Sequence, residues 1–233
     1  MRRIGLLGGM SWESTAEYYR LINTEVATRL GGLHSARVTL GSVDFAEVEA
    51  MQVAGDWGAA GELLAAEAAL LEAGGAELLL ICTNTMHKVA DTIQAAVGIP
   101  LLHVADATAA TVGDAGLTRV GLLGTAFTME QDFYTARLAQ HGLDVLVPTA
   151  RDRADVHRVI YDELCLGVVR EKSRHRYLEV IDALVADGAE GVILGCTEIE
   201  LLIDPDHPRT QVPVFPTTRI HALAAVDAAL AQT

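Results

Sequence analysis

Two cysteines stand in nearly identical local sequences at distant points of the chain. Cys82 lies in AELLLICTNT and Cys196 lies in AEGVILGCTE, so each follows a short apolar run and precedes a threonine. Such a run is typical of a buried parallel strand. A cysteine directly after it lies at the carboxyl end of the sheet, where α/β proteins bind small molecules. Both thiols are therefore candidates for chemistry, although a cysteine at a strand end can also be a small buried apolar residue.

Two thiols on opposite faces of one carbon suit a particular reaction. One thiolate removes a proton from a carbon acid, and the opposite thiol returns a proton to the other face, which inverts the stereocentre. The ordinary thiol pKa is about 8.5, so a modest shift makes both protonation states accessible near neutrality. We expect the helix start after each cysteine to favour the thiolate, because free N–H groups and the helix dipole attract negative charge.

The two cysteine motifs belong to a longer repeat. RIGLLG at 3–8 recurs as RVGLLG at 119–124, and Ile99-Pro100 recurs as Val212-Pro213. Together with the cysteines, these landmarks are offset by 116, 114 and 113 residues, which indicates a duplication rather than chance similarity between strands. We expect lobe 1 over residues 1–105, lobe 2 over 106–220, and a C-terminal helix over 221–233 that packs back on lobe 1.

Strand and helix patterns alternate within each copy. This alternation predicts an α/β fold of two similar lobes, each a parallel sheet flanked by helices, related by pseudo-twofold symmetry with the site in the cleft between them. The predicted strands are Ile4–Leu7, Val38–Val43, Leu78–Ile81, Leu101–Val104, Val120–Leu123, Leu143–Val147, Val192–Leu194 and Val212–Phe215. The predicted helices are Ser11–Leu30, Trp57–Ala73, Thr128–Gln140 and Glu171–Ala186, the third beginning at a capping box formed by Thr128 and Gln131.

Composition excludes several classes of protein. The 233 residues are 51% hydrophobic and 21% charged, which is enough apolar material for a core and excludes a disordered chain. The net charge of −14 argues against a nucleic-acid partner. The basic run Arg170, Lys172, Arg174 and Arg176 is interpreted as a solvated helix face.

Localisation and redox state follow from similar observations. Apolar runs are too short for a membrane span, and the N-terminus lacks the features of a signal peptide, so we expect a cytoplasmic protein. The three cysteines form no C-x-x-C pair, which favours free thiols over a disulfide framework or a zinc site.

No cofactor is expected. The sequence contains neither a P-loop nor G-x-G-x-x-G, and no His, Asp or Glu cluster has the spacing of metal ligands. Lys88 is a weak candidate for a Schiff base.

The segments IGLLGGMSWEST at 4–15, CTNTMHKV at 82–89, LLGT at 122–125 and GCTEIELL at 195–202 resemble the cofactor-independent aspartate/glutamate racemase family. The chain is most similar to the branch of broad-specificity bacterial amino-acid racemases. The resemblance implies an isomerase that needs no pyridoxal phosphate, an amino acid as substrate, Cys82 and Cys196 as the two acid/bases, and frequently a homodimer.

The resemblance also implies roles for the residues around the cysteines. Asn84 and Thr85 would bind the α-carboxylate, with Thr197 contributing from the other lobe. Glu198 would hold the ammonium group or position Cys196, although an acid in a first helical turn is also ordinary. The other expected substrate-binding residues are Met10, Thr83 and Thr125.

The chain departs from the family pattern where a substrate's acidic side chain would be held. Aspartate-specific relatives carry an Arg in the loop after the second strand, whereas this sequence has no Lys or Arg between Arg37 and Lys88. Cys165, interpreted as a packing residue, stands in 161–167 where those relatives carry a Lys. Because a buried carboxylate needs a cationic partner, we expect no strict requirement for an acidic substrate. Gln52 would instead bond a neutral polar side chain.

Two other functions remain open from the sequence. The first is different chemistry on the same fold, by a hydantoin racemase, a dicarboxylate cis–trans isomerase or a decarboxylase. One thiol suffices for a decarboxylase, so two matched thiols argue against it. The second is a non-catalytic binder of a small amino acid.

Overall fold

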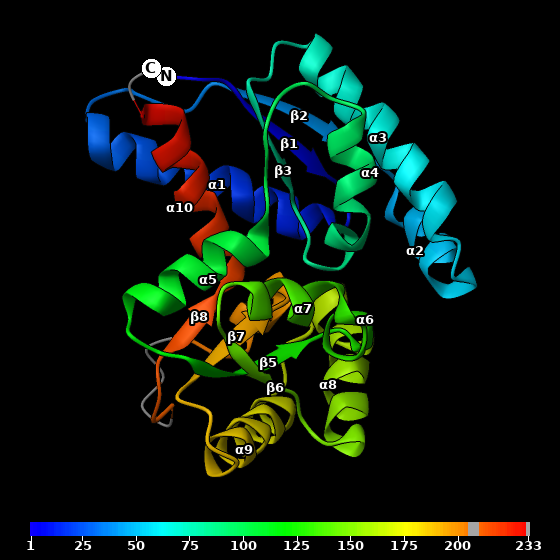
Figure 1. Ribbon diagram of the computed structural model, residues 1–233, viewed down its shortest axis with the longest axis vertical. Coiled ribbons are helices and arrows are strands. Elements are labelled where there is room, and N and C mark those ends of the chain that lie inside the picture. Colours follow the sequence, from blue (N-terminus) through cyan, green and yellow to red (C-terminus); the bar gives the residue numbers. More distant parts are fainter. Residues whose placement is uncertain (205–209, 232–233) are drawn as a thin grey trace. The chain divides into compact units, whose positions relative to one another are not determined.

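A computed structural model describes residues 1–204 and 210–231. The chain forms two compact units, of which unit 1 is Met1–Val104 with the chain from His221 on and unit 2 is Ala105–Ile220. Each unit contains a four-stranded parallel sheet flanked by helices (Figure 1). The predicted α/β class with two similar lobes is therefore confirmed.

Unit 1 is built on a sheet with the strand order β2-β1-β3-β4. Its strands are β1 (Ile4–Gly8), β2 (Val38–Ser42), β3 (Leu78–Ile81) and β4 (Leu101–Leu102). Its helices are α1 (Trp12–Leu30), α2 (Phe45–Ala54), α3 (Trp57–Ala73), the 3-10 helix η1 (Thr85–Val89), α4 (Ala90–Ala95) and most of α10 (Thr217–Leu230).

The side chains of β3 point alternately to the two faces of the sheet, and helices cover both faces. Leu78 and Leu80 pack with α1 and α10, whereas Leu79 and Ile81 pack with α2, α3 and α4. All four side chains are fully buried, so a continuous apolar run is needed here rather than an alternating one. After the buried Ile81, the chain therefore passes directly from the core to the carboxyl edge of the sheet.

Unit 2 repeats the arrangement with the strand order β6-β5-β7-β8. Its strands are β5 (Arg119–Gly124), β6 (Asp144–Leu146), β7 (Gly191–Gly195) and β8 (Val214–Pro216). Its helices are α5 (Val104–Asp114), α6 (Ala126–Glu130), α7 (Asp132–Gln140), α8 (Ala150–Asp162), η2 (Leu164–Leu166), α9 (Glu171–Ala186) and η3 (Thr197–Leu201). In both sheets the first and third strands of the copy are central, so β3 and β7 occupy equivalent positions.

Two local predictions are wrong. The helix expected over Thr128–Gln140 is two helices, because Gln131 is extended and separates α6 from α7. The cap is Thr125, whose hydroxyl accepts a hydrogen bond from the Thr128 N–H at 3.3 Å. Val104, expected to end a strand, is instead the first residue of α5.

Acidic side chains interrupt the apolar sequence of α3 at Glu62, Glu67 and Glu72. Within residues 1–204 and 210–231, no helix combines the length and the apolar character needed to cross a membrane.

Candidate active site

Cys82 follows β3 directly and is fixed through its backbone. Its N–H donates to the Leu7 carbonyl at 2.9 Å, and its carbonyl accepts from the Ser14 hydroxyl at 2.8 Å. The side chain has no exposed surface and packs in the apolar cluster of α1 and α10. Burial raises the pKa of the Cys82 thiol far above its ordinary value, so this sulfur is protonated at neutral pH.

Cys196 follows β7 in the same way but has a different environment. The residue is half-buried, and its thiol donates to Glu198 Oε2 at 2.9 Å. The pKa of Cys196 is raised well above its ordinary value, first by burial and then by the adjacent Glu198 carboxylate. Glu198 is itself buried, so this pair is a positioned thiol and carboxylate rather than a surface contact.

The expectation that helix dipoles favour both thiolates is wrong. The segments that follow the cysteines are η1 and η3, which are 3-10 helices of five residues each. Helices this short have little aligned dipole, and desolvation therefore decides the direction of both pKa shifts.

The expected binding residues of the first copy lie near the carboxyl edge of the sheet in unit 1. Met10 follows β1 and belongs to a buried cluster with Met86 of η1. Gln52 on α2 is also buried, and its amide nitrogen donates to the Met86 sulfur at 3.0 Å. Its amide oxygen has no hydrogen-bond partner in the part of the chain that the structure describes. Among the residues after Cys82, Thr83 is half-buried and Asn84 and Thr85 are buried.

The expected residues of the second copy gather at the corresponding edge of unit 2. Thr125 follows β5, which pairs with β7 up to the Gly124–Gly195 register. Its hydroxyl lies 3.2 Å from that of Thr128 and is used to cap α6. The Thr197 hydroxyl accepts from Thr218 at 3.0 Å. Thr125, Thr197 and Glu198 therefore lie at the same edge as Cys196.

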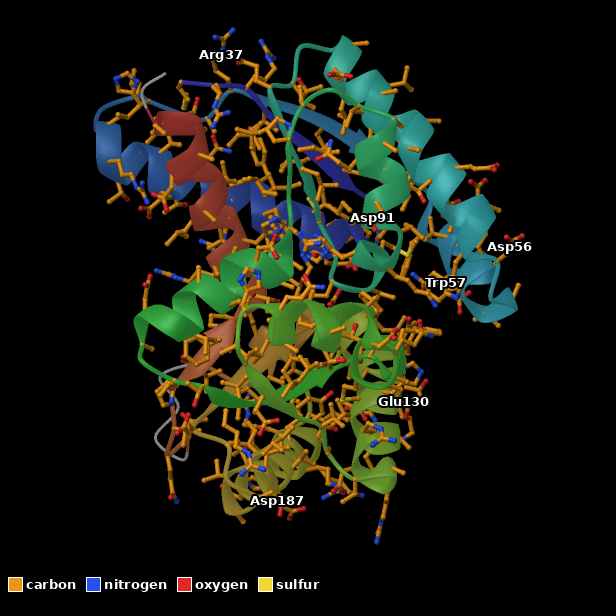
Figure 2. The ribbon with its side chains drawn as sticks, viewed as in Figure 1. Arg37, Asp56, Trp57, Asp91, Glu130 and Asp187 are labelled. Atoms are coloured by element: carbon orange, nitrogen blue, oxygen red, sulfur yellow. The ribbon has the colours of Figure 1, made fainter. Side chains whose placement is uncertain are left out.

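The two cations that flank Gln52 in sequence are Arg37 and Lys88. Arg37 precedes β2, so it lies at the amino edge of the parallel sheet, opposite the end that carries Cys82 (Figure 2). The Lys88 ammonium lies 4.0 Å from the centre of the Trp57 ring, a cation–π contact.

Three buried histidines that sequence reasoning missed support the loop after Cys82. The Nδ1–H of His87 donates to the Thr83 carbonyl at 2.8 Å, and its Nε2 accepts from the Val104 N–H at 3.2 Å. His221 joins the Tyr18 hydroxyl, at 2.9 Å, to the Leu102 carbonyl, at 2.8 Å. The His103 ring lies 4.5 Å from that of His87.

This histidine cluster is structural. Burial lowers the pKa of His87 well below its ordinary value and lowers the pKa of His221 to about 4, so both rings are neutral. In the described residues no three His, Cys, Asp or Glu side chains converge as metal ligands. The cluster therefore ties the Thr83 carbonyl to the chain at Val104. Its members are isolated in sequence, so no local pattern reveals it.

Comparison with known proteins identifies the class. Residues 7–225 match the Asp/Glu/Hydantoin racemase family, and the chain belongs to that family.

Its relatives include proteins of known structure. A candidate Asp/Glu racemase from Yersinia pestis is 55% identical with a TM-score of 0.92, over 99% of this chain and 100% of that one. An aspartate racemase homologue from Pyrococcus horikoshii OT3 is 33% identical with a TM-score of 0.84, over 98% and 99% of the two chains. The broad specificity amino-acid racemase RacX of Bacillus subtilis (strain 168) is 22% identical over 69% of this chain and 68% of its own.

Proposed function

We propose that this protein is a cofactor-independent amino-acid racemase of broad specificity, with Cys82 and Cys196 as its two acid/bases. One observation carries the proposal. Each cysteine directly follows the equivalent strand of its sheet, β3 or β7, in sheets of the same strand order. Membership of the racemase family supports an isomerase. Two matched thiols, rather than one, favour proton removal and proton return by different groups.

The proposed reaction moves one proton onto sulfur and another back to carbon. The thiolate of one cysteine takes the Cα proton and becomes a thiol, while the thiol of the other gives its proton to the opposite face and becomes a thiolate. The product is the mirror-image amino acid, and the enzyme is left ready for the reverse direction. We expect Glu198 to accept the Cys196 proton, because the two groups share a hydrogen bond.

The proposed specificity follows from Gln52. Its buried amide oxygen is an acceptor without a partner in the described chain, and leaving it unsatisfied costs about 1–3 kcal/mol. A substrate side chain with an N–H or O–H donor would satisfy this oxygen, whereas a carboxylate would be repelled by it. We therefore expect neutral polar amino acids to be turned over at rates similar to or above those of aspartate and glutamate.

The test is an incubation of the purified protein with single-enantiomer amino acids in D₂O, with a reductant, EDTA and no pyridoxal phosphate. Inversion and deuterium at Cα are both scored. We expect Cys82→Ser and Cys196→Ser each to lose about 10²–10⁴-fold of the racemisation rate, because a serine hydroxyl does not ionise at neutral pH. Cys165→Ser removes the third thiol, which also influences the pKa of Cys196 but is not one of the two proposed acid/bases, so this variant should retain racemisation.

Two outcomes would contradict the proposal. If either serine variant racemises at the parent rate, the two-base assignment fails. If aspartate or glutamate reacts at least about a hundredfold faster than every neutral amino acid, the specificity argument fails while the mechanism stands.

We also propose a cellular compartment and an oligomeric state for this protein. Three free thiols fit the reducing cytoplasm, which is the proposed compartment. The homodimer implied by the family resemblance remains a prediction, which sedimentation equilibrium of the purified protein tests.

A further inference from the structure

A cavity of about 830 Å³ lies in unit 2, lined by side chains of α8, α9 and the segment between them, and neither Cys82 nor Cys196 is among its lining residues. Five of the 17 Lys and Arg residues of the chain line it, together with only three carboxylates. The cations are Arg151, Arg158, Arg170, Lys172 and Arg176, and the acids are Asp155, Glu163 and Glu179. This excess of positive charge stands out in a protein whose net charge is −14.

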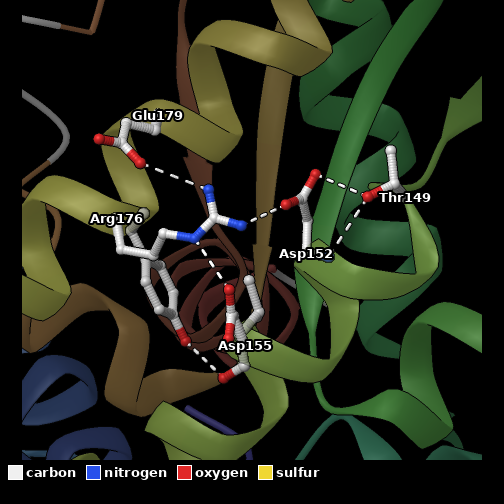
Figure 3. Close-up of polar contacts among 7 residues, drawn as sticks. Thr149, Asp152, Asp155, Arg176 and Glu179 are labelled. Atoms are coloured by element: carbon white, nitrogen blue, oxygen red, sulfur yellow. Dashed lines mark hydrogen bonds and ion pairs between the residues drawn. The ribbon is translucent and has the colours of Figure 1, made fainter.

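Among the cations that line the cavity, Arg176 pairs with three carboxylates. Figure 3 shows its guanidinium between carboxylates of α8 and α9. It bonds Asp155 at 3.0 Å and Glu179 at 3.4 Å, and it also pairs with Asp152. These contacts join the two helices and account for two of the three acids that line the cavity.

Glu163 is the remaining acid, and it is buried. Its carboxylate accepts from the Ser173 hydroxyl at 2.6 Å and faces two guanidiniums, those of Arg170 at 3.3 Å and Arg158 at 3.8 Å. The two arginine side chains are 62% and 54% exposed, so each keeps N–H groups that do not contact Glu163. One carboxylate therefore faces two cations and leaves an unbalanced positive charge.

Arg151 and Lys172 add to this charge. Both are exposed, and neither forms an ion pair within residues 1–204 and 210–231, although the Arg151 charge contributes to the lowered pKa of Asp152. Arg151 comes from α8 and Lys172 from the first turn of α9, so cations enter the cavity from both helices. The basic run of the sequence is thus only partly a solvated helix face, because Arg170, Lys172 and Arg176 line a concave site.

We propose that this cavity binds a small anion that carries at least two phosphate or carboxylate groups. Guanidinium groups bind both kinds of group through paired N–H donors. The volume is in the range of about 300–1,000 Å³ that is typical of small-molecule pockets, and cations on two helices suit two linked anionic groups. The overall negative charge disfavours a long polyanion, which would also extend over the acidic surface.

The test is calorimetric titration of the full-length protein with pyrophosphate and, separately, with citrate at low ionic strength. The two arms distinguish a phosphate ligand from a carboxylate ligand. We expect at least one of them to bind about tenfold or more tightly than sulfate, with an affinity that falls as salt is added. The readout is binding, so it does not depend on racemase activity.

Charge reversal locates the site. Arg151→Glu and Lys172→Glu should each weaken binding by about tenfold or more, and both should fold normally because neither side chain has a recorded ion pair in the described chain. Arg37→Glu makes the same charge change on an exposed residue of unit 1 and should bind like the parent protein.

Three results would overturn the inference. The first is that neither anion binds more tightly than sulfate. The second is that Arg151→Glu and Lys172→Glu bind like the parent protein. The third is that Arg37→Glu weakens binding as much as they do, which would indicate a general field effect.

Discussion

The two candidate thiols are chemically unequal although their motifs match. Cys82 is surrounded by apolar side chains, whereas Cys196 is half-buried as a residue and its thiol is bonded to a carboxylate. Burial disfavours both thiolates, but only Cys196 has a built-in acceptor for its proton. In the absence of ligand, Cys196 is therefore the sulfur that reagents in solution should reach first.

Replacing Glu198 by Gln tests this difference. Loss of the negative charge should lower the pKa of Cys196, because the carboxylate is one of the causes of its elevation. In a Cys82→Ser, Cys165→Ser background, iodoacetamide labelling of Cys196 at pH 8 should accelerate by about threefold to tenfold, and its pH profile should shift to lower pH. Glu200→Gln, the same change two residues along, is the control. An unchanged profile in Glu198→Gln would contradict the assigned role of this acid.

Among individual residues, the sequence indicates those that recur in both copies of the duplication, and it does not indicate those that occur in one copy alone. Cys82 and Cys196 are candidates because the duplication allows them to be compared with each other. The histidine cluster was not found, because His87, His103 and His221 meet only after β3, β4 and α10 have packed. The direction of the thiol pKa shifts was also wrong, since desolvation depends on tertiary burial that local motifs do not encode.

The loop between β1 and α1 is the tightest connection at the carboxyl edge of unit 1. Gly9 has a φ of +94°, and a Cβ placed there would lie 2.2 Å from the Val43 carbonyl oxygen. Its N–H donates to the Thr15 hydroxyl at 2.8 Å, which fixes the loop against the first turn of α1. No side chain fits this position without moving β2 or α1.

Gly9→Ala should therefore destabilise unit 1 by about 2–4 kcal/mol, through strain at positive φ and the backbone clash. Both tryptophans, Trp12 and Trp57, lie in unit 1, so urea unfolding followed by tryptophan fluorescence measures this change. Gly58→Ala in the first turn of α3 is the control, because its Cβ would meet only an ordinary contact at 3.7 Å. Equal stability of the two variants would be inconsistent with the strained loop.

The buried histidines give unit 1 a predicted pH dependence. His221 faces Tyr18, the Leu102 carbonyl and His87, and His87 also faces His103 and the Thr83 carbonyl. The pKa of His221 is about 4 in the folded protein and about 6.5 when unfolded, so the unfolded chain binds the proton more readily. The free energy of unfolding should be greatest above pH 6.5 and should fall by about 3 kcal/mol towards pH 4.

Tryptophan fluorescence in urea at a series of pH values checks this dependence. His221→Asn should be less stable at pH 7 and should lose less stability on acidification. His34→Asn, which changes an exposed histidine of the same unit, should keep the parent slope. A parent slope in His221→Asn would show that other groups control the transition.

Among the elements, the long helices were predicted well and the short ones poorly. Trp57–Ala73 and Glu171–Ala186 agree residue for residue, because glycines or turns end them on both sides. The helix pair α6 and α7 was merged into one, since the extended conformation of Gln131 follows from packing and has no local signal. The two-residue strand β4 was overextended for the same reason.

For the whole molecule, the chain is not divided into two consecutive halves. It leaves unit 1 after Val104 and returns at His221, within α10. Four alanine and valine side chains of α10 are buried in the core of unit 1, where they pack with β1, β3 and α1. They are Ala222, Ala225, Val226 and Ala229. Residues 1–104 alone would expose that apolar surface, so we expect this fragment to aggregate when it is produced by itself.

Because α10 packs in unit 1, the peptide bond between Val104 and Ala105 should not be needed to hold the two parts of the chain together. Two polypeptides, 1–104 and 105–233, should assemble when co-expressed, because the second still supplies α10 to the core of the first and the Ala229 carbonyl still accepts from the Arg2 N–H at 2.9 Å. Co-elution in gel filtration would demonstrate a split protein, and deletion of 221–233 from the longer piece should abolish it. A cut in the chain after Val104, in the first turn of α5, would then leave a complementing pair rather than two separate products.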